Sequence, residues 1–432
     1  MKDLHEMALQ ARNAFYDLSV SDPEQRNRAL EAMAAQLLSD KEQIFSENQV
    51  DLSQAEALQL PGPLLHRLKF DQAKLDQVVS GLCALKSLPD PLGKTTYAEE
   101  ISPGLNLYRV TCPIGVIGVI FESRPDALVQ ISSLALKSGN AVLLKGGREA
   151  LRTNRALTAS LRRAIGSVSL PEDTVQLLET REDVSAMLRE DTLIDLIIPR
   201  GSNAFVRYIM DNSRIPVLGH ADGLCHVYID EEADPETALR VALDSKVQNV
   251  SVCNAMETLL VHEKIAPRVL PLLSKAYAEK GVQLRGDERV QSLISCEKAQ
   301  EEDWQTEYLD YILSIRIVDS LEEAIRHINR YGSHHTDCIV TASAAHAREF
   351  MNRVDSAGVY WNASTRFADG FVYGLGAEVG IATGKLHARG PMGLEGLTTY
   401  KYKLIGSGQT MSDVREGKTA YTHRPLGADC PY

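Results

Sequence analysis

The chain has 432 residues, more than one hydrophobic core usually supports, so two or more lobes are expected. Its 44% hydrophobic and 24% charged residues are typical of a globular protein and exclude a disordered or fibrous chain. The net charge of -12 argues against a polyanion-binding surface, so nucleic acid is not an expected partner.

Seven cysteines, an odd number without any CxxC pair, indicate reduced thiols and hence a cytoplasmic protein. The amphipathic, charged start is neither a signal peptide nor a membrane span. The longest apolar runs are far shorter than the roughly 20 residues that a spanning helix needs, so no membrane association is expected. The histidines, cysteines and carboxylates show no ligand spacing, and no metal site is predicted.

The first part of the chain, residues 1 to about 90, has apolar positions three and four apart and predicts a layer of helices. Short β-branched runs follow from about residue 97. Strands and helices then alternate, with strands expected in "VIGVIF", "NAVLLKG", "TVQLLE" and "LIDLIIP". Because these strands are almost entirely apolar, they indicate a parallel sheet that is covered on both faces.

A second α/β series is predicted from "HVYID" through "METLLVH", "ILSIRIV" and "DCIVT" to "GVYWN", with a glycine-rich return from Gly370 to Gly396. The later stretch "LTTYKYKLIGSG" alternates like an edge strand. We expect it to pair with "GLNLYRVTC" or with another subunit. The tail from Met411 looks irregular.

Two glycine turns follow predicted strands, where backbone N–H groups and helix N-termini favour phosphate. One contains Gly201 and Ser202 and precedes a helix; its alternative is a plain capped turn. The other runs from Lys145 to Arg148, whose cationic side chains suit a nucleotide ribose or phosphate; its alternative is a solvated loop.

Cys253, in "NVSVCNAMETLLVH", is the candidate nucleophile. Small and polar neighbours place it at a predicted loop-to-helix junction, where the helix dipole would favour a thiolate. The alternative is an inert buried thiol, the usual state of free cysteine. Cys338 and Cys83 lie in apolar patterns typical of core. Cys225 adjoins His226, but adjacent strand residues point to opposite faces, so a Cys-His pair is not predicted.

Several segments together resemble the gamma-glutamyl phosphate reductase family of the aldehyde dehydrogenase superfamily over about residues 5–410: PIGVIGVIFESRP, LKSGNAVLLKGG, IDLIIPRGSNA, SVCNAMETLLVH, WNASTRFADG and GLGAEVGIATGKLHARGPMGLEG. "IPVLGHADGLCHVYID" and "WNASTRFADGF" are most similar to the reductase half of bifunctional pyrroline-5-carboxylate synthase. No amino-acid kinase segment precedes the match, so we expect the reductase step alone.

The resemblance implies an aldehyde dehydrogenase-like α/β fold. A Rossmann-type nucleotide-binding domain is expected over residues 1–225, and an α/β catalytic domain with Cys253 over 226–386. Residues 95–112 and 397–432 would form a small β-flap with the C-terminal tail. The flap would add to a partner's sheet, so a homo-oligomer is expected, and glutamate 5-kinase is a candidate partner.

The implied reaction is the NADPH-dependent reduction of L-glutamyl 5-phosphate to L-glutamate 5-semialdehyde and phosphate, in proline biosynthesis. Cys253 would form a thioester, which divides the reduction into two easier steps. Its backbone N–H would hold the oxyanion together with a side-chain donor, for which Asn254 and residues 122–124 are candidates. Hydrolytic relatives carry a glutamate before a Leu-Gly pair where this chain has Val217, Leu218, Gly219 and His220. Valine cannot act as a base, which suits phosphate rather than water as the partner of the thioester.

The resemblance also assigns binding residues. Arg148 stands where NAD-using relatives often have a glutamate, and its guanidinium suits the 2′-phosphate of NADPH. The cofactor is thus expected to contact Lys145, Arg148, Gly201, Ser202 and Glu307; Glu307 would bind the nicotinamide ribose, or else be a solvated carboxylate. The substrate candidates are Asn362, Ser364, Arg366 and Arg389; each arginine has the alternative of clamping a loop carbonyl.

Two alternatives stay open. An aldehyde dehydrogenase of other acyl specificity, making free acids or acyl-CoA, would show a phosphate-independent rate. A non-catalytic oligomeric scaffold would be unaffected by replacing Cys253 with alanine.

Overall fold

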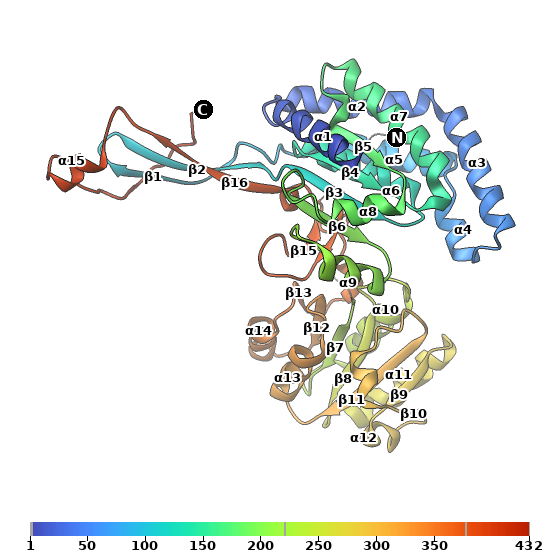
Figure 1. Ribbon diagram of the computed structural model, residues 1–432. Coiled ribbons are helices and arrows are strands. Elements are labelled where there is room, and N and C mark those ends of the chain that lie inside the picture. The colour runs from blue at the N-terminus through green and yellow to red at the C-terminus, as the bar shows by residue number, and fades with distance from the viewer. Residues whose placement is uncertain (1–2, 220–221, 376–377, 432) are drawn as a thin grey trace.

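The computed structural model describes residues 3–219, 222–375 and 378–431 and has two α/β lobes, one of which extends a narrow β-ribbon (Figure 1). His220, which the sequence comparison placed after the Leu-Gly pair, lies outside the described residues. Among the helices of these ranges, none has the length and apolar character needed to cross a membrane. All seven cysteines are described, and all are free thiols.

The predicted layer of N-terminal helices is confirmed: α1 (Leu4–Leu18), α2 (Pro23–Ser39), α3 (Lys41–Ala57), α4 (Gly62–Leu68) and α5 (Gln72–Ser87). Asp22 and Asp71 cap α2 and α5, because each carboxylate accepts the N–H of the residue three positions on. Cys83 is exposed, so its assignment to the core was wrong. The buried side of α5 carries Leu82 and Leu85, and Cys83 is turned about 100° from Leu82.

The first lobe is built on a four-stranded parallel sheet of order β5-β4-β3-β6. The strands are β3 (Val116–Phe121), β4 (Ala141–Lys145), β5 (Val175–Leu178) and β6 (Leu196–Arg200), and the helices are α6 (Pro125–Lys137), α7 (Leu151–Ser167), α8 (Arg181–Met187) and α9 (Asn203–Asn212), with the 3-10 turn η1 (Arg148–Ala150). Alternate strand residues face two different cores, one containing α1 and the other α6 and α7. The predicted parallel sheet, covered on both faces, is therefore confirmed.

The second lobe contains a seven-stranded sheet of order β10-β9-β11-β8-β7-β12-β13, in which every pair is parallel. Its strands are β7 (Cys225–Ile229), β8 (Met256–His262), β9 (Gln283–Gly286), β10 (Glu297–Lys298), β11 (Ile312–Val318), β12 (Thr336–Val340) and β13 (Gly358–Trp361). Its helices are α10 (Pro235–Val247), α11 (Ala266–Glu279), α12 (Glu288–Gln291), α13 (Leu321–Tyr331) and α14 (Ala344–Arg353). The sequence did not predict α10, α12, β9 or β10.

The ribbon is an antiparallel sheet of order β16-β2-β1-β17 that projects from the first lobe (Figure 1). It contains β1 (Thr95–Ser102), β2 (Leu105–Pro113), β16 (Thr398–Ile405) and β17 (Arg424–Pro425). The expected pairing within the chain is confirmed, since Tyr402 is opposite Arg109. The described tail is largely irregular, as predicted, apart from the short helix α15 (Met411–Arg415) and β17, which covers the outer edge of β1. The remaining short strands, β14 (Gly380–Ala382) and β15 (Gly390–Met392), pair with each other. The domain boundaries and the role of the ribbon in assembly stay predictions.

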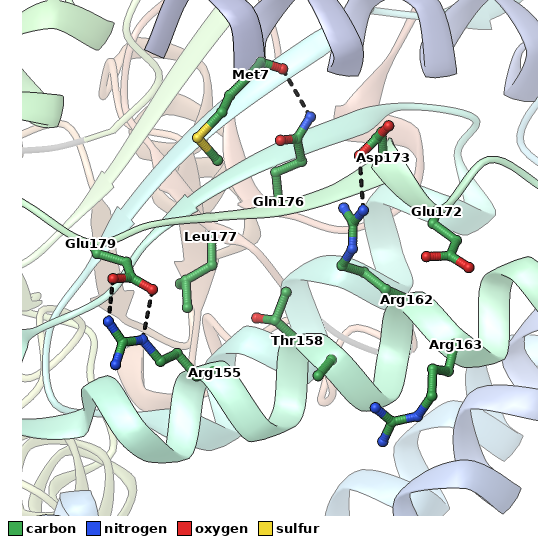
Figure 2. Close-up of a pocket in the computed structure, with 11 residues that line it drawn as sticks. Met7, Arg155, Thr158, Arg162, Arg163, Glu172, Asp173, Gln176, Leu177 and Glu179 are labelled. Atoms are coloured by element: carbon green, nitrogen blue, oxygen red, sulfur yellow. Dashed lines mark hydrogen bonds and ion pairs between the residues drawn. The ribbon is translucent and has the colours of Figure 1, made fainter. Parts of the chain in front are cut away.

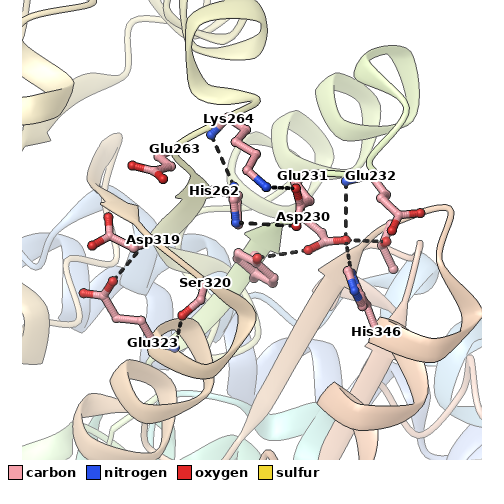
Figure 3. A network of polar contacts seen from close by, with 12 residues as sticks. Asp230, Glu231, Glu232, His262, Glu263, Lys264, Asp319, Ser320, Glu323 and His346 are labelled. Atoms are coloured by element: carbon pink, nitrogen blue, oxygen red, sulfur yellow. Dashed lines mark hydrogen bonds and ion pairs between the residues drawn. The ribbon is translucent and has the colours of Figure 1, made fainter.

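A buried carboxylate, Asp230, joins β7 to the chain after β12 (Figure 3). It accepts hydrogen bonds from Tyr228 Oη at 3.0 Å, Thr341 Oγ1 at 2.7 Å and His346 Nδ1 at 2.8 Å. Burial works against its charged form, but the bonds from His346 and Thr341 outweigh this and lower the pKa of Asp230. The same bond raises the pKa of His346 above its ordinary value.

We expect His346→Gln to lower the Tm more at pH 6 than at pH 9. A histidine with a raised pKa stabilises the fold fully below its unfolded pKa of about 6.5, and this contribution is lost as the pH rises through the folded value. The contribution of Asp230 is lost only in acid, below its ordinary pKa. His346 is 30% exposed, so an effect of only about 2 °C is expected at pH 6. Equal losses at both pH values in thermal scans would contradict the ion pair.

Candidate active site

The candidate nucleophile lies in the loop at residues 248–255, which we call the cysteine loop, between α10 and β8. The expected loop-to-helix junction was wrong, because the element that follows Cys253 is a strand and the helix α10 ends before it. Only the negative end of a helix dipole is therefore near the loop. Burial, followed by the charges of Glu307 and Glu378, raises the pKa of the Cys253 thiol to about 12. In this state the thiol is protonated at neutral pH, not a thiolate as predicted.

Contacts from two other segments hold the cysteine loop. Thr365 Oγ1 donates to the carbonyl of Asn254 at 2.7 Å, and Asn254 Nδ2 donates to the carbonyl of Ala368 at 2.9 Å. Cys225 Sγ donates to the carbonyl of Cys253 at 3.3 Å. A Cβ on Gly223 would lie 2.3 Å from that carbonyl oxygen, so only glycine fits behind the nucleophile.

The neighbour of Cys225, His226, makes a different contact. Its Nδ1 is 2.8 Å from Asp337 Oδ1. The sequence expectation that Cys225 and His226 do not form a pair agrees with these separate partners.

Two arginines and two glutamates interact electrostatically with Cys253. Arg200, the last residue of β6, and Arg366, in the loop after β13, both interact electrostatically with Cys253. Burial lowers the pKa of both arginines. Burial also raises the pKa of Glu378, which the charge of Arg200 opposes.

Sequence reasoning included neither Arg200 nor Glu378 among the site residues. The signal for Arg200 was its place at the carboxyl end of a parallel strand. Glu378 follows no strand, and only its inclusion in the recognised segment GLGAEVG marked it.

Lys145 and Arg148 lie at the carboxyl end of β4, on the same sheet edge as Arg200. Lys145 is buried, and its Nζ donates to the carbonyl of Gly146 at 2.5 Å. Arg148 is exposed at the start of η1 and has no ion-pair or hydrogen-bond partner for its guanidinium in the described part of the chain. Lys145 is therefore held by the backbone, whereas Arg148 is accessible to a ligand.

Gly201 and Ser202 lie at the N-terminus of α9, where Ser202 is the N-cap residue. The N–H of Ser202 hydrogen-bonds to the carboxylate of Glu122. A Cβ on Gly201 would lie 3.1 Å from Glu122 Oε1. Burial and then the charge of Glu149 raise the pKa of Glu122. The N-terminus of α9 therefore already has an acidic partner.

Glu307 connects the two lobes. Its Oε2 accepts a hydrogen bond from Asn203 Nδ2 on the first turn of α9, and its charge is the second cause of the raised pKa of Cys253. Glu307 is consequently close to both the nucleophile and the glycine turn, rather than an isolated solvated carboxylate.

The proposed substrate residues are distributed more widely. Arg366 is beside Cys253, and its Nε donates to Gln248 Oε1 at 2.9 Å. The Ser364 hydroxyl is buried and accepts from Ser245 Oγ at 3.2 Å. Their role in binding substrate stays a prediction.

Asn362 and Arg389 make contacts that do not include the cysteine loop. Both amide atoms of Asn362 bond to the backbone of Thr341, at 2.9 and 3.0 Å, beyond the carboxyl end of β12. Cys253 precedes β8 and is therefore at the opposite edge of this parallel sheet. Arg389 contacts the carbonyls of Thr383 and Asp355, as the loop-clamp alternative requires. The geometry lends no support to a substrate role for either.

Val217, in the position of the hydrolytic glutamate, forms an isolated parallel bridge with Ile197 of β6. Its side chain packs on the core that contains α1. No base is present at this position to activate water.

A pocket of about 450 Å³ opens between α1, α7 and β5 (Figure 2). Its arginines are paired with acidic side chains: Arg155 with Glu179, and Arg162 with Asp173 at 2.8 Å. None of the predicted site residues lines this pocket.

Comparison with known proteins identifies the family of the chain. The model of the aldehyde dehydrogenase family matches residues 1–301. The chain is 57% identical to the gamma-glutamyl phosphate reductase of Pelotomaculum thermopropionicum over 99% of this chain and 98% of that protein. It is 52% identical to gamma-glutamyl phosphate reductase 1 of Synechocystis, over 98% of each chain. The crystal structure of gamma-glutamyl phosphate reductase from Thermotoga maritima superposes with a TM-score of 0.93 at 38% identity, covering 95% of this chain and 100% of that one.

The chain therefore belongs to the aldehyde dehydrogenase family, whose members are oxidoreductases that use NAD or NADP. Within that family it belongs to the gamma-glutamyl phosphate reductases, as its identity over nearly the whole chain shows.

Two substitutions should change the reactivity of Cys253 in opposite directions. Glu307→Gln removes a negative charge, lowers the pKa of the thiol, and should raise the rate of alkylation by iodoacetamide at pH 8 about three- to tenfold. Arg200→Met removes a positive charge and should slow alkylation. Mass spectrometry of the Cys253 peptide, with Cys253→Ala as the blank, measures both rates. Changes in the same direction would contradict the charge arrangement.

Proposed function

We propose that the chain reduces L-glutamyl 5-phosphate to L-glutamate 5-semialdehyde and phosphate with NADPH, as a step of proline biosynthesis. The observation that carries this proposal is that Arg200 and Arg366 both interact electrostatically with Cys253, as does Glu307, the carboxylate that contacts α9. A nucleophile with two cations near it suits an acyl group whose leaving group is phosphate. The names of the related reductases support the same substrate.

The first step is attack of the Cys253 sulfur on the acyl carbon. The bond from that carbon to the phosphate oxygen breaks, and its electron pair leaves with phosphate. Because burial raises the pKa of the thiol, its proton has to be removed as the substrate binds. Glu378 is suited to accept it, since it interacts with both Cys253 and Arg200 and burial raises its own pKa.

The thioester is protected from hydrolysis because Val217 supplies no base. The backbone N–H of Cys253 stabilises the oxyanion. Asn254 is a weaker donor candidate, because its Nδ2 already bonds to the carbonyl of Ala368. The semialdehyde is released when the carbon–sulfur bond breaks and the thiol recovers its proton.

The residues at the carboxyl edge of the first sheet fit a nicotinamide dinucleotide. Arg148 is exposed and available for a 2′-phosphate, Lys145 is fixed beside it, and α9 begins next to Glu307. The carboxylate of Glu122 lies close to Gly201, so it has to move for a pyrophosphate to bind there. When bound, the cofactor supplies a hydride.

The expected assembly is a cytoplasmic homo-oligomer in which the ribbon of one chain adds to the sheet of another. The exposed Tyr400, Tyr402 and Leu404 on one face of β16 support such a contact. Glutamate 5-kinase, which would supply the labile acyl phosphate, is proposed as a partner of this assembly.

The reverse assay tests the reaction. Glutamate semialdehyde should reduce NADP only in the presence of phosphate, and Cys253→Ala should remove turnover, because the proposed thioester forms on the Cys253 sulfur. The absorbance of NADPH at increasing phosphate concentration measures this dependence. A phosphate-independent rate would support another acyl specificity, and turnover by Cys253→Ala would exclude the nucleophile.

Arg148→Glu tests the cofactor. It should lower kcat/KM for NADPH by about 10- to 100-fold, the value of a charge-assisted pair, while changing kcat/KM for NADH far less. Arg155→Glu, on the pocket of Figure 2, is a matched charge reversal away from the site. Equal losses with both cofactors would show that Arg148 does not recognise the phosphate.

A further inference from the structure

A buried ion pair lies directly behind the cysteine loop. Lys246, on the last turn of α10, and Glu257, the second residue of β8, are 0% and 1% exposed, and Lys246 Nζ is 2.6 Å from Glu257 Oε2. The two residues flank the loop that carries Cys253. Burying both charges costs desolvation energy that a pair of apolar side chains would not, so a buried pair by itself is weak evidence of a stabilising role.

The second oxygen of Glu257 makes a contact outside the loop. Glu257 Oε1 accepts the backbone N–H of Leu309 at 3.2 Å. Leu309 has a φ of 52°, a left-handed conformation that a leucine adopts only where its surroundings hold it. It is two residues from Glu307, which contacts α9.

The cysteine loop does not depend on this pair alone. It is also held by Thr365, Ala368 and Cys225, as described above. The segment at residues 306–311 is connected to β8 by the hydrogen bond from the N–H of Leu309 to Glu257. The pair therefore has more influence on Glu307 than on Cys253.

We propose that Lys246 and Glu257 are positioning residues, in which Lys246 orients the Glu257 carboxylate and Glu257 holds Leu309, so that Glu307 stays in place for the nicotinamide ribose. This inference rests on the proposed function. The ion pair would then help to set the distance between Cys253 and the bound cofactor. The rate of hydride transfer depends strongly on this distance.

Two double variants separate the hydrogen bond to Leu309 from the burial of charge. Lys246→Met/Glu257→Gln removes both charges but keeps an amide oxygen that can accept the N–H of Leu309. Lys246→Met/Glu257→Leu also removes both charges and has no acceptor. Neither leaves a lone buried charge, which would be the most damaging change. Lys137→Met is the control for loss of a buried lysine elsewhere, since Lys137 bonds to Asn27 and Lys86.

The readouts are the Kd for NADPH by titration calorimetry, kcat and KM for NADPH, and the alkylation rate of Cys253. Lys246→Met/Glu257→Leu should bind NADPH about fivefold more weakly than Lys246→Met/Glu257→Gln, the effect of one neutral hydrogen bond. Its kcat should also be lower. The alkylation rate should stay within about twofold in both, because the other anchors of the cysteine loop are intact. Lys137→Met should leave Kd and kcat unchanged.

Equal NADPH affinity in the two double variants would overturn the proposal, as would a change in alkylation larger than the change in affinity. If both double variants have the Kd for NADPH and the kcat of wild type, the ion pair has no positioning role. Should Lys246→Met/Glu257→Leu not fold, Lys246→Met/Glu257→Met replaces it, because methionine is closer to glutamate in length and also has no acceptor for the N–H of Leu309. Weaker NADPH binding than in Lys246→Met/Glu257→Gln is again expected.

An inactive wild type in the reverse assay would overturn the proposed reaction but leave the affinity and alkylation tests decisive. Wild type that binds neither NADPH nor NADH would overturn both proposals.

Discussion

The packing of the cysteine loop against two neighbouring segments is the constraint on which the rest of the site depends. The carbonyl of Cys253 lies so close to Gly223 that no side chain fits there, and Thr365 and Ala368 bond to the residue that follows. These contacts fix the backbone of the nucleophile before any ligand binds. A preorganised backbone N–H stabilises an oxyanion without reorganisation during the reaction, so this rigidity has a direct chemical value.

The packing that fixes the cysteine loop also disfavours the charged form of the Cys253 thiol. Holding the sulfur between the lobes removes it from water, and two carboxylates face it, which together keep the thiol protonated. Arg200 and Arg366 oppose this only in part. In the proposed reaction an acyl phosphate would give both arginines a charged partner.

The sequence predicted most of the elements with strong local patterns and missed short ones without them. Buried strands such as β3 and β8 and the amphipathic N-terminal helices were assigned correctly, because a mostly apolar run or an apolar face at helical spacing is a clear local pattern. The helix α10 (Pro235–Val247) was missed although Asp234 caps it and Ala238, Val241 and Ala242 are buried at helical spacing. The two-residue strands β10 and β17 have no such signal. The short strand in the polar tail was missed because it is specified by the edge of β1, which is more than three hundred residues away in the sequence.

The candidate site was also predicted only in part. Cys253, Glu307 and the turn at Ser202 were found from the recognised segments, and the structure brings them together. The expected thiolate was wrong because a helix dipole was inferred from neighbours that precede a strand. The substrate role of Asn362 stays a prediction, and in this structure both of its amide atoms bond to the backbone of Thr341.

Glu122 and Glu307 both lie near the N-terminus of α9, and Glu307 also interacts electrostatically with Cys253. In this structure its carboxylate accepts the N–H of Ser202 at the start of α9, and Asn203 in the next position bonds to Glu307. Under the proposed function, a phosphate at α9 would displace Glu122, whereas Glu307 already contacts α9 through Asn203. The helix N-terminus would then exchange one anion for another and keep its contact to the catalytic lobe. Because Glu307 also raises the pKa of Cys253, any change in its surroundings on cofactor binding reaches the sulfur directly, through charge rather than through a rearrangement of the loop.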